Sequence, residues 1–278
     1  MSLRQLEAEL GTKLFERTVK GVTPTDAGRI YYRHACTLRQ SALYARQEIE
    51  KEMSGHRGTL RIGAGVAWAT TIIPGVLIEI NKIYPDLSLN LVTGVGDQLA
   101  ALFEAGKLDV YLAAGPMEPP QSPDYTSRFL TNIPMVAVTD PSNALAGKIS
   151  VTMAELVATK WAGFYEDDIF LYHAAHFMAL HGLPAPIISM RTNSVVALME
   201  FVKGTGTVTL VSSPLLEKVT EAGLVVLPLT SALWEIPVSI YARAGAKSVE
   251  PIQYFTELLS NSIKIIHSNT ERLTGLDH

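Results

Sequence analysis

The chain has 278 residues, of which 47% are hydrophobic and 18% are charged, a balance typical of globular proteins that excludes a largely disordered chain. Its net charge of −4 is unevenly spread: residues 1–61 carry 11 Lys and Arg against 7 Asp and Glu, whereas residues 62–278 carry 12 against 20. The basic N-terminal part favours nucleic acid as a partner. A single cysteine, Cys36, excludes an internal disulfide. Without an apolar run of membrane-spanning length or a signal peptide, we expect a cytoplasmic protein.

The chain is expected to begin with an amphipathic helix. Four leucines recur at intervals of three or four residues and therefore share one helical face: Leu3, Leu6, Leu10 and Leu14. Gly11 suits the left-handed position that ends helices, so we expect the helix to end there. Arg4 lies on the opposite, solvated face and is a candidate for contact with DNA.

A β-hairpin is expected to follow this helix. Residues 15–18 and 22–23 can pair across a tight turn formed by residues 19–21. Such a hairpin would project polar and basic side chains toward a phosphate backbone. The candidates for contact with DNA in the hairpin are Arg17, Thr18 and Lys20.

The next element is predicted to be a long helix over residues 27–53. The Thr25 hydroxyl can cap its start, and Asp26 in the first turn complements the helix dipole. Apolar or small residues then follow a heptad spacing: Tyr31, Ala35, Leu38, Ala42, Ala45 and Ile49. A seam of this kind requires a partner helix. The alternative is a helix that packs on its own domain.

Strands and helices alternate beyond a glycine-containing joint at residues 54–58. Strands at 59–63, 87–93 and 108–113 with helices at 69–84 and 97–106 form a βαβαβ pattern, which predicts a mainly parallel sheet. The second set comprises strands at 134–139, 161–164, 187–191, 207–211, 224–227 and 234–242, a further element at 151–159, and helices at 168–181, 194–203 and 251–266. Two crossings near Asn132 and Thr230 would join the sets into a bilobed α/β domain with a cleft.

The N-terminal motifs resemble the LysR-type family of bacterial transcriptional regulators. The matching positions are Leu6-Glu7-x-x-Leu10-Gly11-x-x-Leu14-Phe15-x-Arg17 and Thr25-x-Ala27-Gly28. In that family the end of a recognition helix, a two-stranded wing and a linker helix follow in this order. Members carry two further helices and the front of the recognition helix before these positions, so we expect the chain as given not to bind an operator unaided.

The rest of the chain resembles, more weakly, the effector domain of the same family, which has the fold of type II periplasmic solute-binding proteins. Positions that fit include Leu60-Arg61-Ile62-Gly63, Ile73-Pro74, Tyr84-Pro85 and Leu108-Asp109. The resemblance implies DNA and a small effector as partners, a homodimer through the linker helix and a homotetramer beyond it. The expected divisions are 1–24 (partial winged helix-turn-helix), 25–57 (linker helix) and 58–267 (effector domain), with lobe I at 58–132 and 230–267 and lobe II at 133–229.

The cleft of such a domain is the candidate effector site. Loops at the carboxyl ends of parallel strands face the cleft, here 65–68, 94–97 and 191–194, and backbone amides there suit a small anion such as a carboxylate. The candidate binding residues are Val66, Ala67, Trp68, Thr70, Gly96, Asp97, Phe164, Tyr165, Thr192, Asn193 and Ser194. Trp68 could cover the effector or pack in the core, and Asp97 is favoured as the N-cap of its helix.

Other interpretations of the chain are less favoured. The glycine-containing stretch at 63–68 is not a dinucleotide fingerprint, because Trp68 stands where close helix packing requires Gly or Ala. His173, His176 and His181 are expected to be ordinary helix histidines rather than metal ligands. We therefore expect no enzyme activity, cofactor or metal. A solute-binding protein without DNA-binding activity is the alternative, but it would need an export signal and no heptad helix.

Overall fold

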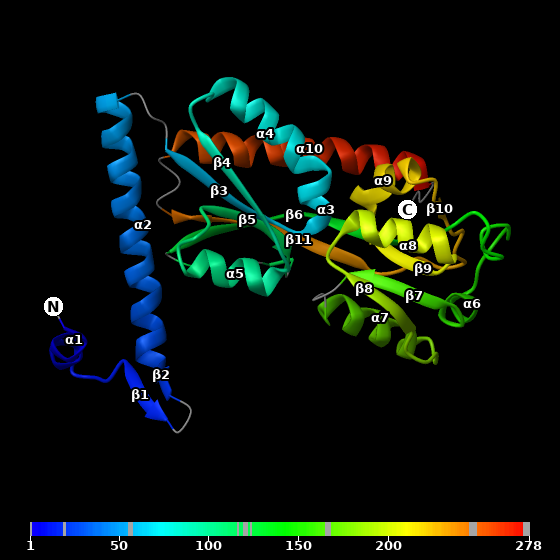
Figure 1. Cartoon of the computed structure of the whole chain (residues 1–278), viewed down its shortest axis with the longest axis horizontal. Helices are drawn as coiled ribbons and strands as arrows, with labels where there is room; N and C mark the ends of the chain where they lie inside the picture. Colours follow the sequence, from blue (N-terminus) through cyan, green and yellow to red (C-terminus); the bar gives the residue numbers. More distant parts are fainter. Residues whose placement is uncertain are drawn as a thin grey trace.

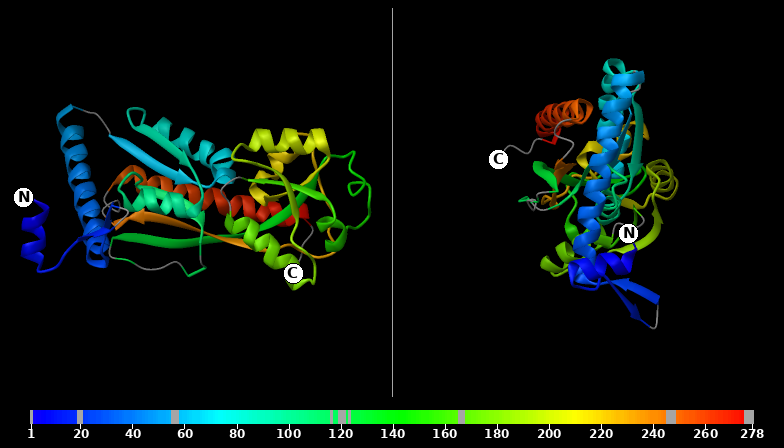
Figure 2. Two further views of the ribbon diagram at one scale, coloured as in Figure 1. Left: turned by 60° about the horizontal axis from the view of Figure 1, so that its bottom comes forward. Right: turned by 90° about the vertical axis from the view of Figure 1, so that its left-hand side faces the viewer.

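The computed structural model describes residues 2–18, 21–54, 58–115, 117–118, 122, 124–164, 168–244 and 249–274 (Figure 1). An N-terminal arm, residues 2–54, stands beside an elongated α/β body (Figure 2). The arm contains α1 (Leu3–Leu10), β1 (Phe15–Thr18), β2 (Gly21–Pro24) and α2 (Asp26–Ser54). No helix within the described ranges is long and apolar enough to cross a membrane.

Helix α1 ends as the sequence predicts. Gly11 is its C-cap with a φ of 65°, in the left-handed region that favours glycine. The start of the helix is fixed by Ser2, whose hydroxyl accepts a hydrogen bond from the Gln5 amide. Helix α1 has no buried residue, so its apolar side chains are not enclosed by this chain.

The predicted hairpin is present, and its second strand begins one residue earlier than the sequence suggested. Strands β1 and β2 are antiparallel, and Phe15 pairs with Pro24 while Thr18 pairs with Gly21. Gly21 was expected in the turn, but it is the first residue of β2. Its φ of 124° lies in a region that side chains disfavour, which explains a glycine at this position.

Contacts between α1, the hairpin and α2 explain the fixed spacing of the N-terminal motif. The Glu7 carboxylate accepts hydrogen bonds from the amides of Leu14 (2.7 Å) and Phe15 (3.2 Å). The Thr25 hydroxyl accepts from the Gly28 amide at 3.0 Å, which confirms the predicted cap of α2. A Cβ atom on Gly28 would lie 2.0 Å from the Leu14 carbonyl oxygen, so the packing of Leu14 on α2 requires glycine there.

The body contains one continuous path of strands in the order β4-β3-β5-β11-β6-β9-β7-β8, with β10 paired to β6. The strands are β3 (Thr59–Ala64), β4 (Ser88–Thr93), β5 (Val110–Ala114), β6 (Tyr125–Thr139), β7 (Lys160–Phe164), β8 (Ile187–Thr192), β9 (Val208–Ser212), β10 (Val225–Val226) and β11 (Glu235–Arg243). The helices are α3 (Val66–Thr70), α4 (Ile72–Ile83), α5 (Gly96–Glu104), α6 (Met153–Val157), α7 (Asp168–Leu180), α8 (Val195–Thr205), η1 (Ser213–Leu215), α9 (Leu216–Glu221) and α10 (Glu250–Thr274).

The long strands β6 and β11 connect the two lobes of the body. Strand β3 is parallel to β4 and β5 in lobe I, as the βαβαβ pattern predicts, and β7 is parallel to β8 and β9 in lobe II. The first part of β6 pairs with β11 in lobe I, and its last part pairs with β9 in lobe II. The two chain crossings meet where the Met135 amide donates to the Trp234 carbonyl at 3.1 Å.

Two elements differ from the sequence prediction. Residues 125–133 form the first part of β6, although only residues 134–139 were predicted as a strand, because polar residues such as Ser127 and Asn132 hide the strand pattern. The helix predicted over residues 69–84 is split into α3 and α4 at Thr71. Pro74 lacks an amide hydrogen and is tolerated in the first turn of a helix, which favours a new helix starting at Ile72.

Each lobe has its own apolar core. In lobe I, α4 and α10 cover one face of the sheet and α5 covers the other (Figure 1). In lobe II, Trp161 is 1% exposed, and its indole nitrogen donates to the Leu156 carbonyl at 2.9 Å. The lobes also touch each other, since Ala67 of α3 packs with the lobe II cluster that contains Val211 and Leu215.

Helix α2 presents opposite faces to different surroundings. Its heptad seam is largely open: Leu38 is 72% exposed and Ile49 58% exposed. On the other side Cys36 and Gln40 are buried. One face of α2 thus packs on this chain, as the alternative interpretation expects, and pairing of the exposed seam with a second helix stays a prediction.

Candidate functional site

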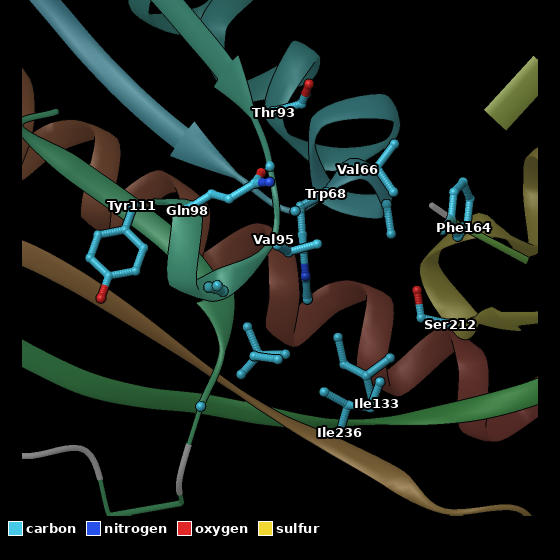
Figure 3. A pocket seen from close by; sticks show the side chains of 18 of the residues that line it. Val66, Trp68, Thr93, Val95, Gln98, Tyr111, Ile133, Phe164, Ser212 and Ile236 are labelled. Carbon is cyan, nitrogen blue, oxygen red and sulfur yellow. The ribbon is translucent and has the colours of Figure 1, made fainter. Parts of the chain in front are cut away.

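A cavity of about 560 Å³ lies where the two lobes meet. Lobe I supplies the ends of β3, β4 and β5 and the starts of α3 and α5, and lobe II supplies the end of β9 and the loop before α8. Figure 3 shows Val66, Trp68 and Val95 on the lobe I side and Phe164 and Ser212 on the lobe II side. The cavity is therefore formed by the carboxyl-end loops that the sequence singled out.

Many of the predicted binding residues come together in this cavity. Its lining includes Val66, Ala67, Trp68, Gly96, Asp97, Phe164 and Asn193. Tyr165 lies outside the described residues. Trp68 fits both of its interpretations, because it is 6% exposed within the core of lobe I and also lines the cavity.

Three predicted hydroxyl residues are not among the lining residues. The Thr70 hydroxyl donates to the Val66 carbonyl at 2.7 Å within its own helix. The Thr192 hydroxyl accepts from the Ser194 amide at 3.1 Å, and the Ser194 hydroxyl accepts from the Ala197 amide at 3.2 Å, which caps α8. These three hydroxyls form hydrogen bonds with the backbone of neighbouring residues.

Several lining residues were not predicted from the sequence. They are Thr93, Gln98, Ala100, Tyr111, Ile133, Met135, Leu215, Ile236, Val238 and Tyr241 together with residues 113–115 and 210–212. The loop after β5 could have been found, because β5 is parallel to β3 and its carboxyl end faces the same edge. The residues of β6 and β11 carry no such signal, since they depend on where two distant strands cross.

The lining is largely apolar, with few ionisable groups. Ile133 and Ile236 lie together on the long crossing strands, while Thr93, Gln98 and Ser212 add polar atoms (Figure 3). Among the described lining residues there is no Lys, Arg or His, and the carboxylate present is that of Asp97. A ligand charge would consequently be balanced by backbone dipoles and polar side chains rather than by a basic side chain.

The role predicted for Asp97 at the start of its helix is wrong. The N-cap of α5 is Val95, and Asp97 is the second residue of the helix. The Leu99 amide donates to the Val95 carbonyl at 3.0 Å, and the residues between them form the first turn of α5 at the cavity. The positive end of the α5 dipole therefore faces both the Asp97 carboxylate of the first turn and the cavity.

One wall of the cavity is a stack of aromatic rings. The rings of Tyr111 and Tyr241 are stacked with centroids 4.6 Å apart and planes at 9°. Phe103 packs against Tyr111 with centroids 5.0 Å apart. Burial raises the pKa of Tyr111 above its ordinary value of 10.0, and burial also raises the pKa of Tyr241. Both hydroxyls are therefore neutral at physiological pH.

The predicted contacts with DNA lie on the arm. Arg4 on α1 and Arg17 on β1 are exposed, and Arg17 pairs with the exposed Val22 across the hairpin. Thr18 lies at the end of β1 opposite Gly21, and Lys20 lies outside the described residues. Within the described ranges no group of three or more His, Cys, Asp or Glu side chains is arranged to hold a metal ion.

Family comparisons match both parts of the chain. The family described as "LysR substrate binding domain" matches residues 53–263. The family described as "Bacterial regulatory helix-turn-helix protein, lysR family" matches residues 1–29.

Curated relatives are similar over about half of their length. The HTH-type transcriptional regulator ShiR of Corynebacterium glutamicum is 30% identical over 155 residues, covering 55% of this chain and 52% of ShiR. The HTH-type transcriptional activator AaeR of Escherichia coli is 32% identical over 164 residues, covering 58% of this chain and 50% of AaeR. The chain thus spans about half the length of the curated relatives it matches.

Solved structures share the fold at low sequence identity. Full-length OxyR from Pseudomonas aeruginosa has a TM-score of 0.65 at 19% identity and covers 94% of this chain and 83% of OxyR. The effector binding domain of QuiR in complex with shikimate has a TM-score of 0.60 at 13% identity and covers 74% of this chain and 97% of the QuiR chain. The BenM effector binding domain with its effector benzoate has a TM-score of 0.57 at 18% identity and covers 77% of this chain and 93% of the BenM chain.

Proposed function

Since this chain belongs to the LysR family, we propose that it regulates transcription by binding a small metabolite between its lobes and coupling that binding to DNA contacts made by its arm. The observation that carries the proposal is the 560 Å³ cavity at the junction of the lobes. Its volume falls within the range of small-molecule sites, and its mostly apolar lining with a few polar groups is typical of them. The proposed role is regulatory rather than catalytic, in the cytoplasm.

We propose a carboxylate-bearing compound as the effector. The start of α5 lies at the cavity, and the positive end of a helix dipole supports this class. The ring of Trp68 and the stacked Tyr111 and Tyr241 favour an apolar or cyclic body next to the carboxylate. BenM with benzoate and QuiR with shikimate are similar in fold, which adds support for a compound of this size. The proposed contacts include Val66, Ala67, Trp68, Gly96, Asp97, Phe164 and Asn193.

The coupling requires that the ligand bind two arrangements of the lobes with unequal affinity. A ligand that contacts both Trp68 of lobe I and Phe164 of lobe II favours the arrangement in which the lobes approach each other. The ligand shifts the population only by the difference between its affinities for the two arrangements. That shift is passed to α2 and from there to the spacing of DNA contacts.

DNA binding and assembly use the arm. The exposed Arg4 and Arg17 are proposed to contact phosphates, and sequence reading needs the helices that precede these positions in family members. The exposed seam with Leu38 and Ile49 is proposed to pair with α2 of a second copy, giving a homodimer that assembles further to a homotetramer. We retain 1–24, 25–57 and 58–267 as the functional divisions of the chain.

A thermal-shift comparison tests the binding proposal. Benzoate and shikimate are titrated against the chain, with benzamide as a neutral partner of benzoate. We expect a carboxylate to raise the melting temperature and the amide to give a smaller shift, because only the carboxylate gains from the start of α5. No shift with a broader set of small carboxylates would contradict the proposal.

Two matched variants locate the binding site. Ser212 lines the cavity, so Ser212→Phe fills part of it, whereas Ser231 is exposed and does not line the cavity, so Ser231→Phe leaves the cavity open. The shift produced by a bound carboxylate should be lost in Ser212→Phe and kept in Ser231→Phe. Equal shifts in both variants would place the binding site elsewhere.

A further inference from the structure

A buried polar contact joins α2 to lobe I. Gln40 of α2 is 1% exposed, and its amide nitrogen donates to the Asp109 carboxylate at 2.9 Å. Asp109 is 0% exposed, and its other oxygen accepts from the Arg61 amide at 2.8 Å, with the Arg61 guanidinium 3.7 Å away. A buried carboxylate requires such partners, because an unpaired charge in the interior is costly.

Neighbouring polar contacts support this position of α2. The Arg39 guanidinium donates to the Ala105 carbonyl at 2.6 Å, and His34 lies 3.6 Å from the Asp124 carboxylate. Cys36, one turn before Gln40 on the same side, is 5% exposed. The surface of α2 that meets lobe I is thus held by a small number of directional contacts rather than by a broad apolar face.

The docking face does not compete with the seam. Gln40 follows Leu38 by two residues, which places the two side chains about 160° apart around the helix. Gln40 can therefore stay on lobe I while Leu38, 72% exposed, meets a second helix. One helix can accordingly contact its own effector domain and a partner copy simultaneously.

Three strands of lobe I connect this contact to the cavity. Asp109 immediately precedes β5, whose residues Ala113 and Ala114 line the cavity at the other end. Arg61 is in β3, which leads to the cavity loop at 65–68, and β11 runs from the cavity to Arg243, whose side chain donates to the Leu108 carbonyl at 3.1 Å. The distance along β5 is about 16 Å at the usual rise of a strand.

We infer that Gln40 and Asp109 are positioning residues that fix the linker helix on lobe I and connect its orientation to the effector cavity. The inference rests on the proposed function for its biological use, but the connection itself is a property of the fold. Hydrogen-bonded strands shift as units, so a change at the cavity ends of β3, β5 and β11 displaces the acceptor of Gln40. By reciprocity, disturbing the Gln40 contact changes the cavity end of the same strands.

The thiol of Cys36 gives a direct readout of this docking. It is the single cysteine of the chain and lies on the docking side of α2. The rate of its reaction with an aromatic disulfide reagent is measured on the full chain at one fixed protein concentration. Gln40→Glu places a second carboxylate against Asp109, so we expect the rate to rise by about tenfold or more, because a hydrogen bond to a buried charge is replaced by repulsion.

Controls separate the contact from general destabilisation. Arg33 lies two turns before Gln40 on the same side of α2 and is exposed, and Arg33→Gln changes the net charge by the same amount as Gln40→Glu. It should leave the Cys36 rate at the wild-type value. The double variant Gln40→Glu with Asp109→Asn reverses donor and acceptor and should restore a slow rate. Gln40→Leu, which introduces no charge, should give an intermediate rate if the charged variant does not fold.

Hydrogen exchange tests the connection to the cavity without any ligand. In Gln40→Glu, protection should fall in peptides covering 62–68 and 110–115 and stay unchanged at 208–212 of lobe II. An unchanged Cys36 rate in Gln40→Glu and Gln40→Leu would overturn the docking role. Exchange confined to α2, or a double variant as reactive as Gln40→Glu, would overturn the connection. Because neither readout uses an effector, failure here is distinct from failure of the binding test above.

Discussion

The arm and the body are held together by different forces. The body encloses many large apolar side chains, such as Phe255 at 1% exposure and Trp161 at 1%. The described part of the arm encloses few, since Leu14 is 2% exposed but Leu3 is 47% and Val22 64% exposed. The body is stabilised by burial of apolar surface, whereas the arm keeps its shape through a few local contacts at Glu7, Thr25 and Gly28. Changes in the first part of the arm, residues 2–28, should therefore leave the body intact.

The largest effect is expected in the core of lobe I. Phe255 of α10 is enclosed by the sheet and α4. Phe255→Ala should lower the free energy of unfolding by about 3–5 kcal/mol, because it removes buried apolar surface and leaves a cavity. Urea denaturation followed by tryptophan fluorescence measures this change. A decrease in the free energy of unfolding below about 1 kcal/mol would mean that neighbouring side chains fill the space left by the ring.

A somewhat smaller effect is expected at the junction of the hairpin and α2. Gly28→Ala would put a methyl group 2.0 Å from the Leu14 carbonyl oxygen, a backbone atom that cannot turn away. The docked position of Leu14 should be destabilised by about 3 kcal/mol. Hydrogen exchange should rise over residues 3–24, while the melting temperature of the body stays at the wild-type value. A lower melting temperature of the body would break the distinction between the two regions.

The contact of Glu7 should have a smaller effect in the same region. Glu7→Ala removes the acceptor of the Leu14 and Phe15 amides and should cost about 2 kcal/mol of local stability. Glu9→Ala is the matched control, since Glu9 is exposed on the same helix. Limited proteolysis of the arm should become faster only for Glu7→Ala. Equal proteolysis rates for the two variants would show that the Glu7 hydrogen bonds do not stabilise the arm.

The smallest effect concerns the pH dependence of the body. Lys148, then the amide and hydroxyl of Thr152, lower the pKa of Glu155 from its ordinary value of 4.5 to about 2. Since the pKa is lower in the folded state, the contribution of Glu155 is complete above pH 4.5 and is lost as the pH falls toward 2. The melting temperatures of wild type and Glu155→Gln should converge over that range. A constant difference would show that the carboxylate charge adds nothing.

The sequence predicts most of the fold because local rules act at particular residues. Gly11 ends α1, Thr25 caps α2, and the alternation of strands and helices gives the parallel sheets. The first part of β6 escaped prediction, since its polar residues follow no apolar alternation. The burial of Gln40 was not predicted either. A polar residue on a helix gives no sign of being buried, and its partner Asp109 lies 69 positions further along the chain.

The candidate site was predictable in part. The loops after β3 and β4 follow from a general rule for parallel sheets, and they do line the cavity. Hydroxyl residues were harder, because Thr192 and Ser194 can bind a ligand or cap a helix with the same atoms, and the structure uses them for backbone. Ile133 and Ile236 reach the cavity through strand crossings that only the folded chain defines.

The coupling of cavity and linker helix is tested most directly by following the Cys36 thiol during a ligand titration. The compound is the carboxylate that gives the largest thermal shift, and the variant Ser212→Phe serves as the control without binding. We expect the reaction rate of Cys36 to change with the same midpoint as the binding curve in wild type and to stay constant in Ser212→Phe. A constant rate in wild type at saturating ligand would contradict the claim that the cavity and α2 are connected.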